Sequence, residues 1–233
     1  MPPPYYCAEN LRSDTFDILK YNISLWVGNT FTPQIRGNTA IRFAPRINNR
    51  TFIRLDLLRL TVDSVKENNA LLSYTYNDTV LKINFISVKN VADTSTITVY
   101  YKGQPATDSQ WGGFYFDNNS GNQYAYNLGV GFAASPHNYG RVWFPCFDNF
   151  VEHSKYEFNI TTDTLRRAYC NGQLMSDLIS GTNRTRRWVM DKEITSYLAS
   201  VSVAKYTQVN WNINLLQGNK PIMLVAVPAD TQA

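Results

Sequence analysis

The sequence predicts an all-β protein: a large antiparallel β-sandwich or saddle-shaped β-domain with little helix. Apolar and polar residues alternate along many short segments, and aromatic residues make up 14% of the chain. Turn residues separate these segments at intervals of roughly ten residues, which is typical of sandwiches. Period-two alternation marks half-buried strands, and aromatic side chains pack well on sheets. No convincing amphipathic helix interrupts the pattern.

The first half of the chain carries the clearest alternation. Residues 21–27 alternate and are followed by Gly28-Asn29, which is a turn signal. Asn77-Asp78 is a hairpin-turn signal between two further alternating segments. The same reasoning predicts strands over residues 40–43, 51–57, 60–65, 71–76, 80–85 and 97–101.

Residues 103–140 break this pattern and are rich in Gly, Asn, Ser and Tyr. Long loops in compact domains are usually functional or disordered, and the aromatic residues embedded here argue against disorder. Beyond this segment, Asn171-Gly172 is the strongest hairpin signal in the chain. Later strands are predicted over residues 156–160, 188–190, 197–206 and 221–227.

No linker divides the chain, so its domain organisation is predicted to be simple. Residues 1–14 are polar and proline-marked, and we expect a flexible leader there. Residues 15–233 are expected to form a single all-β domain.

Residues 136–150 form the densest aromatic segment of the chain. Pro145 restricts Phe144 to extended conformations and cannot donate a ladder hydrogen bond, which predicts an irregular packed corner. Arg141 and Asp148 need partners if they are buried there, and each could satisfy the other or meet nearby backbone. The residue types leave open whether the corner is only part of the core or also supports a binding surface.

Charge and metal-ligand patterns exclude several functions. The chain has 22 basic and 18 acidic residues, a net charge of +4 that is too small and scattered to indicate nucleic acid or membrane binding. Its 3 cysteines cannot form a complete disulfide framework, although one bridge remains possible. His137 and His153 are too far apart for a zinc-binding His-Glu-x-x-His motif, so we expect no metal or other cofactor in this chain.

The N-terminus has no apolar core of the kind a signal peptide needs, and no segment reaches the length of a membrane span. A removed signal peptide would leave no trace. A periplasmic or secreted location is favoured, on the weak evidence of Asn-x-Ser/Thr sites at Asn22, Asn49, Asn77, Asn118, Asn159 and Asn183.

One motif in the aromatic corner resembles a family signature. Arg141-x-x-Phe144-Pro145-Cys146-Phe147-Asp148 is similar to the motif near the end of the N-terminal β-domain of the aminopeptidase N family of zinc metallopeptidases. The resemblance extends over about residues 15–228, and further matching segments follow in the family's order at 16–25, 111–115, 168–172, 195–199 and 221–226.

This resemblance implies a non-catalytic domain. In the family, the β-domain precedes a helical catalytic domain that carries the zinc ligands, and none of its motifs is present here. We therefore expect the chain alone not to hydrolyse peptides, because it cannot activate a metal-bound water. The implied partners are its own catalytic domain, where zinc is expected, and a peptide substrate bound by the full-length enzyme.

One departure from the family pattern concerns substrate binding. Family members commonly carry Gln-x-Glu before the Arg-x-x-Phe-Pro-Cys motif, where the carboxylate helps to hold the free amino group of the substrate. The nearest counterpart here is Gly131-Phe132-Ala133, which has no carboxylate. The resemblance thus implies that Gly131, Phe132 and Ala133 line the cleft without the amine-binding group, and that Arg141, Phe144, Pro145, Cys146 and Asp148 are a scaffold.

A second hypothesis is a free-standing module that binds glycan or protein. Trp111, Tyr115, Tyr124 and Tyr126 would then form an exposed aromatic platform. Ordinary β-packing also accounts for these residues. An excised domain is instead expected to expose an apolar patch larger than monomers usually tolerate.

Overall fold

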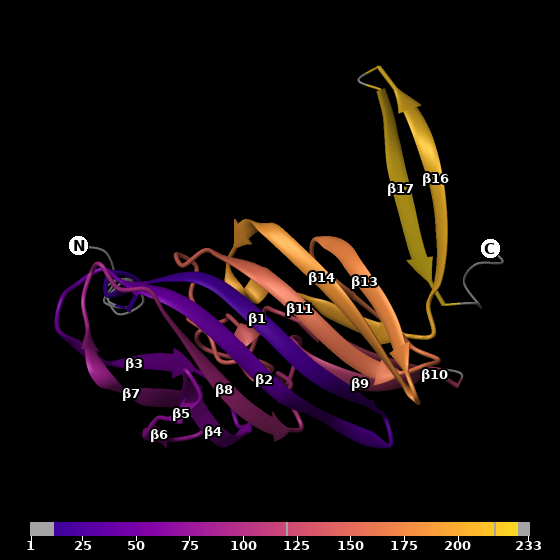
Figure 1. The fold of residues 1–233 in the computed structure, drawn as a ribbon. Helices are drawn as coiled ribbons and strands as arrows, with labels where there is room; N and C mark the ends of the chain where they lie inside the picture. Colours follow the sequence, from indigo (N-terminus) through magenta and orange to yellow (C-terminus); the bar gives the residue numbers. More distant parts are fainter. Residues whose placement is uncertain (1–11, 120, 217, 228–233) are drawn as a thin grey trace.

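The computed structural model describes residues 12–119, 121–216 and 218–227, and it confirms the all-β fold (Figure 1). Helical structure in this part of the chain is limited to short turns, among them η1 (Gly140–Val142) and η2 (Ser196–Leu198). No described helix is long and apolar enough to cross a membrane.

An 8-stranded sheet forms the long curved layer of the molecule. Its central strands β1 and β11 run parallel, from Lys20 opposite Lys155 to Trp26 opposite Thr161, whereas its other neighbours are antiparallel. This pair is therefore a parallel exception within the predicted, mainly antiparallel fold. In order, the strands are β13 (Gln173–Ser180), β14 (Asn183–Ile194), β11 (Ser154–Asp163), β1 (Phe16–Asn29), β2 (Thr32–Pro45), β8 (Ser95–Gly103), β4 (Thr61–Glu67) and β5 (Ala70–Leu71).

Two smaller sheets pack with the long sheet around a common core. The 3-stranded sheet contains β3 (Arg50–Asp56), β7 (Val80–Lys89) and β6 (Tyr74–Tyr76). The 4-stranded sheet contains β12 (Arg167–Cys170), β15 (Val201–Ala204), β10 (Asn122–Leu128) and β9 (Gly113–Asn119). Phe158 of the long sheet, Ile83 of the 3-stranded sheet and Ala125 of the 4-stranded sheet have no exposed surface and belong to one cluster, which shows that one core joins all three.

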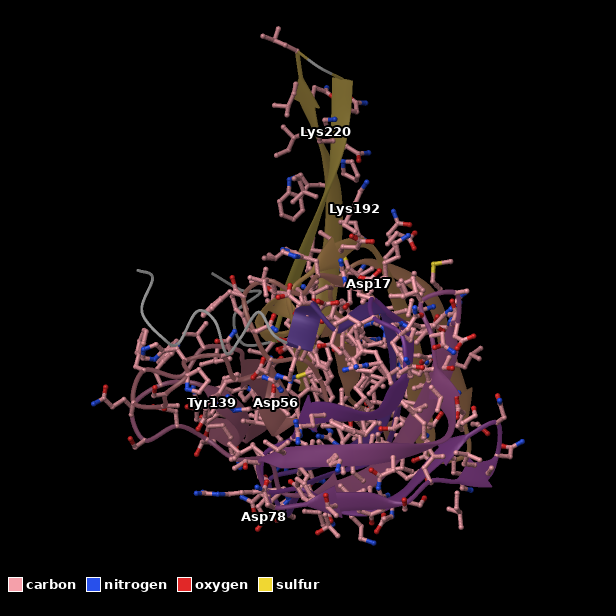
Figure 2. All side chains as sticks on the ribbon, turned by 90° about the vertical axis from the view of Figure 1, so that its left-hand side faces the viewer. Asp17, Asp56, Asp78, Tyr139, Lys192 and Lys220 are labelled. Carbon is pink, nitrogen blue, oxygen red and sulfur yellow. The ribbon has the colours of Figure 1, made fainter. Side chains whose placement is uncertain are left out.

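A separate 2-stranded hairpin, β16 (Thr207–Leu215) and β17 (Gly218–Ala226), projects from this body in both views (Figure 1; Figure 2). Lys220, near its far end, lies well away from Asp56 and Tyr139 in the body (Figure 2). β16 is missing from the strands predicted above. Its apolar residues nevertheless alternate with Asn210, Asn212 and Asn214, so the signal was present.

The Asn-Gly signal at residues 171–172 does not close a hairpin. β12 and β13 flank it but belong to different sheets, so the turn passes the chain from one layer to the other. Gly172 adopts a φ of 92°. The dipeptide thus supplies the left-handed conformation that its sequence indicates, while burial in two layers decides which strands pair.

Other predicted turns and segments differ in extent. The Asn77-Asp78 hairpin is confirmed between β6 and β7, with Asp78 at a φ of 65°. The chain reverses after Asn29 rather than at Gly28, because the Asn29 side chain accepts hydrogen bonds from the backbone N–H of Phe31 and Thr32. The expected loop 103–140 contains β9 and β10, and the expected strand 197–206 is regular only over β15.

Most of the expected leader, residues 1–11, lies outside the described residues. Its last residues form a helical turn against the body. The guanidinium of Arg12 lies 2.8 Å from the Asp56 carboxylate, and the Thr15 backbone N–H donates to the Arg12 carbonyl.

Candidate substrate-facing loop

Residues 129–139 connect β10 to η1 and contain the candidate residues Gly131, Phe132 and Ala133. The loop closes on itself through backbone hydrogen bonds, from Tyr139 N–H to the Gly129 carbonyl at 2.8 Å and from Gly131 N–H to the His137 carbonyl at 2.7 Å. The backbone is therefore fixed at both ends of the loop.

Asp108 joins this loop to the segment before β9. One carboxylate oxygen accepts hydrogen bonds from the backbone N–H groups of Gln110, Trp111 and Ala133 at 2.9, 3.1 and 3.2 Å. The other oxygen accepts from Ala134 N–H at 2.7 Å. These donors, the Gln110 N–H foremost, lower the pKa of the Asp108 carboxyl from its ordinary value because they stabilise the charged form. Sequence reasoning did not single out Asp108, and its only local signal is the tendency of Asp to cap its own turn.

Trp111 and Phe132 form an exposed aromatic pair on this surface. Their ring centroids are 6.5 Å apart with an interplanar angle of 24°, and the Phe132 N–H donates to the Trp111 carbonyl. Relative exposures of 51% and 61% show that both rings face solvent. Two aromatic faces are thus available to a ligand.

The three candidate loop residues are not equivalent. Phe132 and Ala133 are exposed, whereas Gly131 is buried. A Cβ at residue 131 would lie 3.0 Å from an Asp108 carboxylate oxygen and 3.2 Å from the Tyr139 ring. Gly131 thus permits close backbone packing, and of the three residues only Phe132 and Ala133 present side chains outward.

Arg141 and Asp148 support the loop from behind, and each meets backbone or another side chain. The Arg141 guanidinium donates to the Pro136 carbonyl at 3.1 Å, which holds the far side of the loop. The Asp148 carboxylate accepts from the Arg141 backbone N–H at 3.1 Å and from the Ser196 hydroxyl at 2.6 Å. Of the two partnerships left open by the sequence, the contact with nearby backbone is the one found.

Burial dominates the electrostatics of Asp148. It raises the pKa of this carboxyl from 3.8 to about 6, although the Ser196 hydroxyl acts in the opposite direction. The Asp148 backbone N–H donates to Asp56, which pairs with Arg12. The motif is therefore linked through hydrogen bonds to β3 and to the start of the described chain.

Phe144, Pro145 and Cys146 are buried at the centre of the corner. The Phe144 ring packs edge-on against Tyr21 at 5.5 Å, and the Cys146 backbone pairs in both directions with Asp56. Cys146 is a free thiol whose pKa is raised well above its ordinary value by burial. A buried, protonated thiol is a poor nucleophile and metal ligand, so the geometry fits a scaffold.

Among the described residues, no group of His, Cys, Asp and Glu side chains is arranged to hold a metal ion. The two histidines make separate hydrogen bonds: His137 Nδ1 with the Gly131 carbonyl, and His153 Nδ1 with the Val151 carbonyl.

The aromatic residues proposed as one platform form separate ring pairs. Tyr115 and Tyr126 stack at 5.3 Å, while Trp111 pairs with Phe132 instead. Tyr126 also borders a depression of about 500 Å³ on the 4-stranded sheet. Its other lining residues are mainly aromatic, amide and hydroxyl side chains: Asn127, Tyr169, Cys170, Asn171, Ser200, Val201, Ser202 and Tyr206.

Solved structures with the same fold include an M1 zinc metallopeptidase and a leukotriene A4 hydrolase. The arrangement of sheets is that found in part of the M1 zinc metallopeptidases, which confirms at the level of fold what the sequence motifs implied. The M1 zinc metallopeptidase of Deinococcus radiodurans superposes with a TM-score of 0.77 and 16% identity over 92% of this chain and 48% of that chain. Leukotriene A4 hydrolase from Saccharomyces cerevisiae gives 0.67 and 19% identity, over 84% of this chain and 30% of that one.

Sequence comparison adds no assignment. No family model matches the chain, and no curated protein matches it. The chain spans about half the length of the Deinococcus enzyme. At these identities the likeness shows a shared fold.

Proposed function

We propose that this chain is the N-terminal β-domain of an M1-type zinc metallopeptidase. The domain packs on the catalytic domain and lines one wall of its substrate cleft with residues 131–133. The observation that carries the proposal is the superposition over 92% of this chain on 48% of an M1 metallopeptidase. The fixed loop with its outward-facing Phe132 and Ala133 supports the assignment of the cleft wall.

The catalytic proposal is tested by comparing two proteins, residues 1–233 and the complete product of the natural reading frame. We expect the complete product to contain His-Glu-x-x-His, to bind one zinc ion per chain and to cleave peptides. Residues 1–233 should contain no stoichiometric zinc and show no peptidase activity. A zinc ion held tightly by the short chain, or a complete product without a zinc motif, would contradict the proposal.

A finer prediction concerns Ala133, which stands where the family commonly has the glutamate that holds the substrate's free amino group. Ala133 is exposed, so Ala133→Glu would place a carboxylate on the cleft wall at little steric cost. We expect the KM for peptides with a free N-terminus to fall several-fold, because an opposite charge stabilises the bound ammonium. Ala133→Gln is the matched neutral control, and N-acetylated peptides should respond to neither change. An unchanged KM for free peptides would sink the cleft assignment of this loop.

The depression beside Tyr126 favours one alternative, a free-standing glycan-binding module. Aromatic faces combined with amide and hydroxyl groups are the lining that sugars require. A glycan array and titration with Tyr126→Ala and Tyr169→Ala variants would test it. Micromolar binding that both variants abolish would favour this function, whereas the peptidase proposal predicts no such binding.

A further inference from the structure

Two positively charged side chains lie directly opposite each other on the outer face of the 3-stranded sheet. Arg54 on β3 pairs with Lys82 on β7, and both side chains point away from the buried Ile53 and Ile83. Like charges in this position destabilise a sheet. In the part of the chain that the structure describes, no ion pair joins either side chain to an acidic group. A negatively charged ligand between them would therefore remove an unfavourable interaction.

Aromatic rings position the cations of this face. The Arg54 guanidinium carbon lies 4.8 Å from the centre of the Phe52 ring, and Lys82 Nζ lies 4.5 Å from the same centre. The Arg12 guanidinium lies in the same way over Phe147, at 5.7 Å. A guanidinium over an aromatic face can still offer its N–H edge to a carboxylate. Because the rings already hold the cations, less side-chain entropy is lost when a ligand binds.

Two depressions meet at Arg54, and we call them together the basic groove. The first has a volume of about 260 Å³ and is lined mainly by arginine and phenylalanine: Arg12, Arg50, Arg54, Phe16, Phe52 and Phe147. The second, of about 280 Å³, lies between Arg54, Lys82 and Asn77. None of the described residues that line either depression is Asp or Glu. The groove is therefore suited to a ligand that carries several negative charges.

The groove also runs along the edge of β3, the outer strand of its sheet. Asp56 N–H donates to the Cys146 carbonyl at 2.8 Å, and Cys146 N–H donates back at 3.0 Å. Alternate residues of a strand direct their backbone groups to the same side, so those of Phe52 and Arg54 also face this edge. The described residues provide no hydrogen bond to them there. An extended peptide can continue the pairing that Cys146 begins.

We propose that the basic groove binds an extended acidic peptide segment of another protein. Its backbone pairs with β3 at residues 52–54, and its carboxylates contact Arg50, Arg54 and Lys82. The free backbone edge favours a peptide over nucleic acid or a sulfated glycan, because only a peptide supplies N–H and C=O groups at strand spacing. The positive charges repel the same edge of a second copy and attract an acidic strand.

The position of the groove makes this inference independent of the proposed function. The strands β3, β6 and β7 lie at the end of the body away from the projecting hairpin (Figure 1). Asp78, in the turn between β6 and β7, and Lys220 of the hairpin lie at opposite ends of the molecule (Figure 2). Peptidase activity and peptide binding in the groove can therefore be measured separately.

Fluorescence anisotropy with a synthetic acidic peptide tests the proposal. The probe alternates glutamate and valine, and a fluorescein label blocks its N-terminus against aminopeptidase cleavage. We expect saturable binding to residues 1–233 and to the complete product at about 50 mM salt, where exposed charges are weakly screened. A glutamine–valine peptide should bind at least about tenfold more weakly, because its side chains are neutral. N-methylation of alternate amides should weaken binding as strongly, because it removes donors that strand pairing needs.

Arg54→Gln should weaken binding of the acidic probe at least about fivefold, because it removes a charged donor from the exposed wall of the groove. Arg36→Gln is the matched control. The Arg36 guanidinium also lies over an aromatic ring, that of Trp26 at 4.6 Å, but on the long sheet. This variant should bind the probe as the native protein does.

Each other outcome would overturn the proposal. Absent binding, or an equal loss in both variants, would remove the groove as the site. Unchanged binding of the N-methylated peptide would mean that charge alone is recognised, as for nucleic acid or a sulfated glycan. Binding lost in the complete product would mean that a following domain covers the groove, and binding only in a chain that starts at Arg12 would assign the groove to residues 1–11.

Discussion

Asp108 bonds the loop at Ala133 and Ala134, and Asp148 bonds the Arg141 backbone N–H just beyond the loop. Their surroundings shift their pKa values in opposite directions. Asp108 accepts several backbone hydrogen bonds, which favours its charged form. Asp148 is buried, which favours its neutral form. We therefore expect the hydrogen bonds of Asp108 and those of Asp148 to change with protonation in different pH ranges.

The first residue-scale prediction concerns Asp108→Asn. The amide group presents N–H where one carboxylate oxygen now accepts a hydrogen bond, so at least one contact with the loop is lost. We expect the amides of Ala133 and Ala134 to exchange at least tenfold faster in a hydrogen-exchange measurement. Asp117→Asn is the control, because the hydrogen bond described for its carboxylate is local, from the Asn118 N–H. Equal exchange in both variants would show that Asp108 does not hold the loop.

The second prediction concerns Asp148 and pH. The folded chain keeps this proton up to about pH 6, whereas the unfolded chain releases it near 3.8. Folding binds the extra proton in that interval, so this group makes the free energy of unfolding decrease as the pH rises through it. The total decrease is roughly 3 kcal/mol. It is complete above the folded pKa.

Asp148→Asn removes this titration and retains a hydrogen-bonding side chain. In urea unfolding from pH 4 to pH 7, the stability of the native protein should fall relative to that of the variant. Asp63→Asn, at an exposed carboxylate paired with Lys102, is the control and should not change the profile in this way. A constant stability difference between native protein and Asp148→Asn at every pH would rule out the buried titration.

At the scale of elements, Gly172 lies where the chain passes from β12 in the 4-stranded sheet to β13 in the 8-stranded sheet. Its φ is 92°, and a Cβ there would lie 2.1 Å from the Val189 carbonyl oxygen. The chain therefore requires glycine both for conformation and for space.

Gly172→Ala should lower the free energy of unfolding by more than about 2 kcal/mol, because the strand β14 has to move. Gly181→Ala is a matched control: its φ is also positive, at 57°, but nothing lies within 4 Å of the added methyl group. The control should lose only about 1 kcal/mol in chemical denaturation. Equal losses would mean that Gly172 is needed for its φ alone.

The alternation in residues 21–27 and 80–85 was enough to predict β1 and β7, because the face of each side chain is a local property. Strand partners are not local. Nothing near β1 indicates that it pairs in parallel with β11, or that β12 pairs with β15 rather than β13. The same limit applies to the site: the aromatic corner was visible in sequence, whereas the contacts of Asp108 depend on two segments that only folding brings together.

For the whole molecule, the body and the hairpin are expected to be energetically separate. The core residues come from the three sheets of the body and from the aromatic corner, and the side chains of β16 lie outside that core. The hairpin should contribute little to the stability of the body.

Replacing residues 209–224 with a two-residue Asn-Gly turn tests this separation. Gln208 and Val225 lie directly opposite each other and can be joined by a tight turn. We expect the free energy of unfolding, measured by heat and by urea, to change by less than about 1 kcal/mol. Aggregation should decrease because exposed apolar side chains such as Trp211 and Ile213 are removed. Ile160→Ala, in the core, should cost about 2–5 kcal/mol and serves as the positive control. A comparable loss in the shortened chain would show that the hairpin supports the body.

The parallel pairing of β1 with β11 also has a consequence for synthesis on the ribosome. β1 can pair with β2 early, but its other edge lacks a partner until residues 154–163 have been translated. At 5–20 residues per second, that edge remains open for roughly 7 to 27 seconds in each nascent chain. An open strand edge recruits other strands, so yield in the cell should depend on chaperones that shield β1 during this interval.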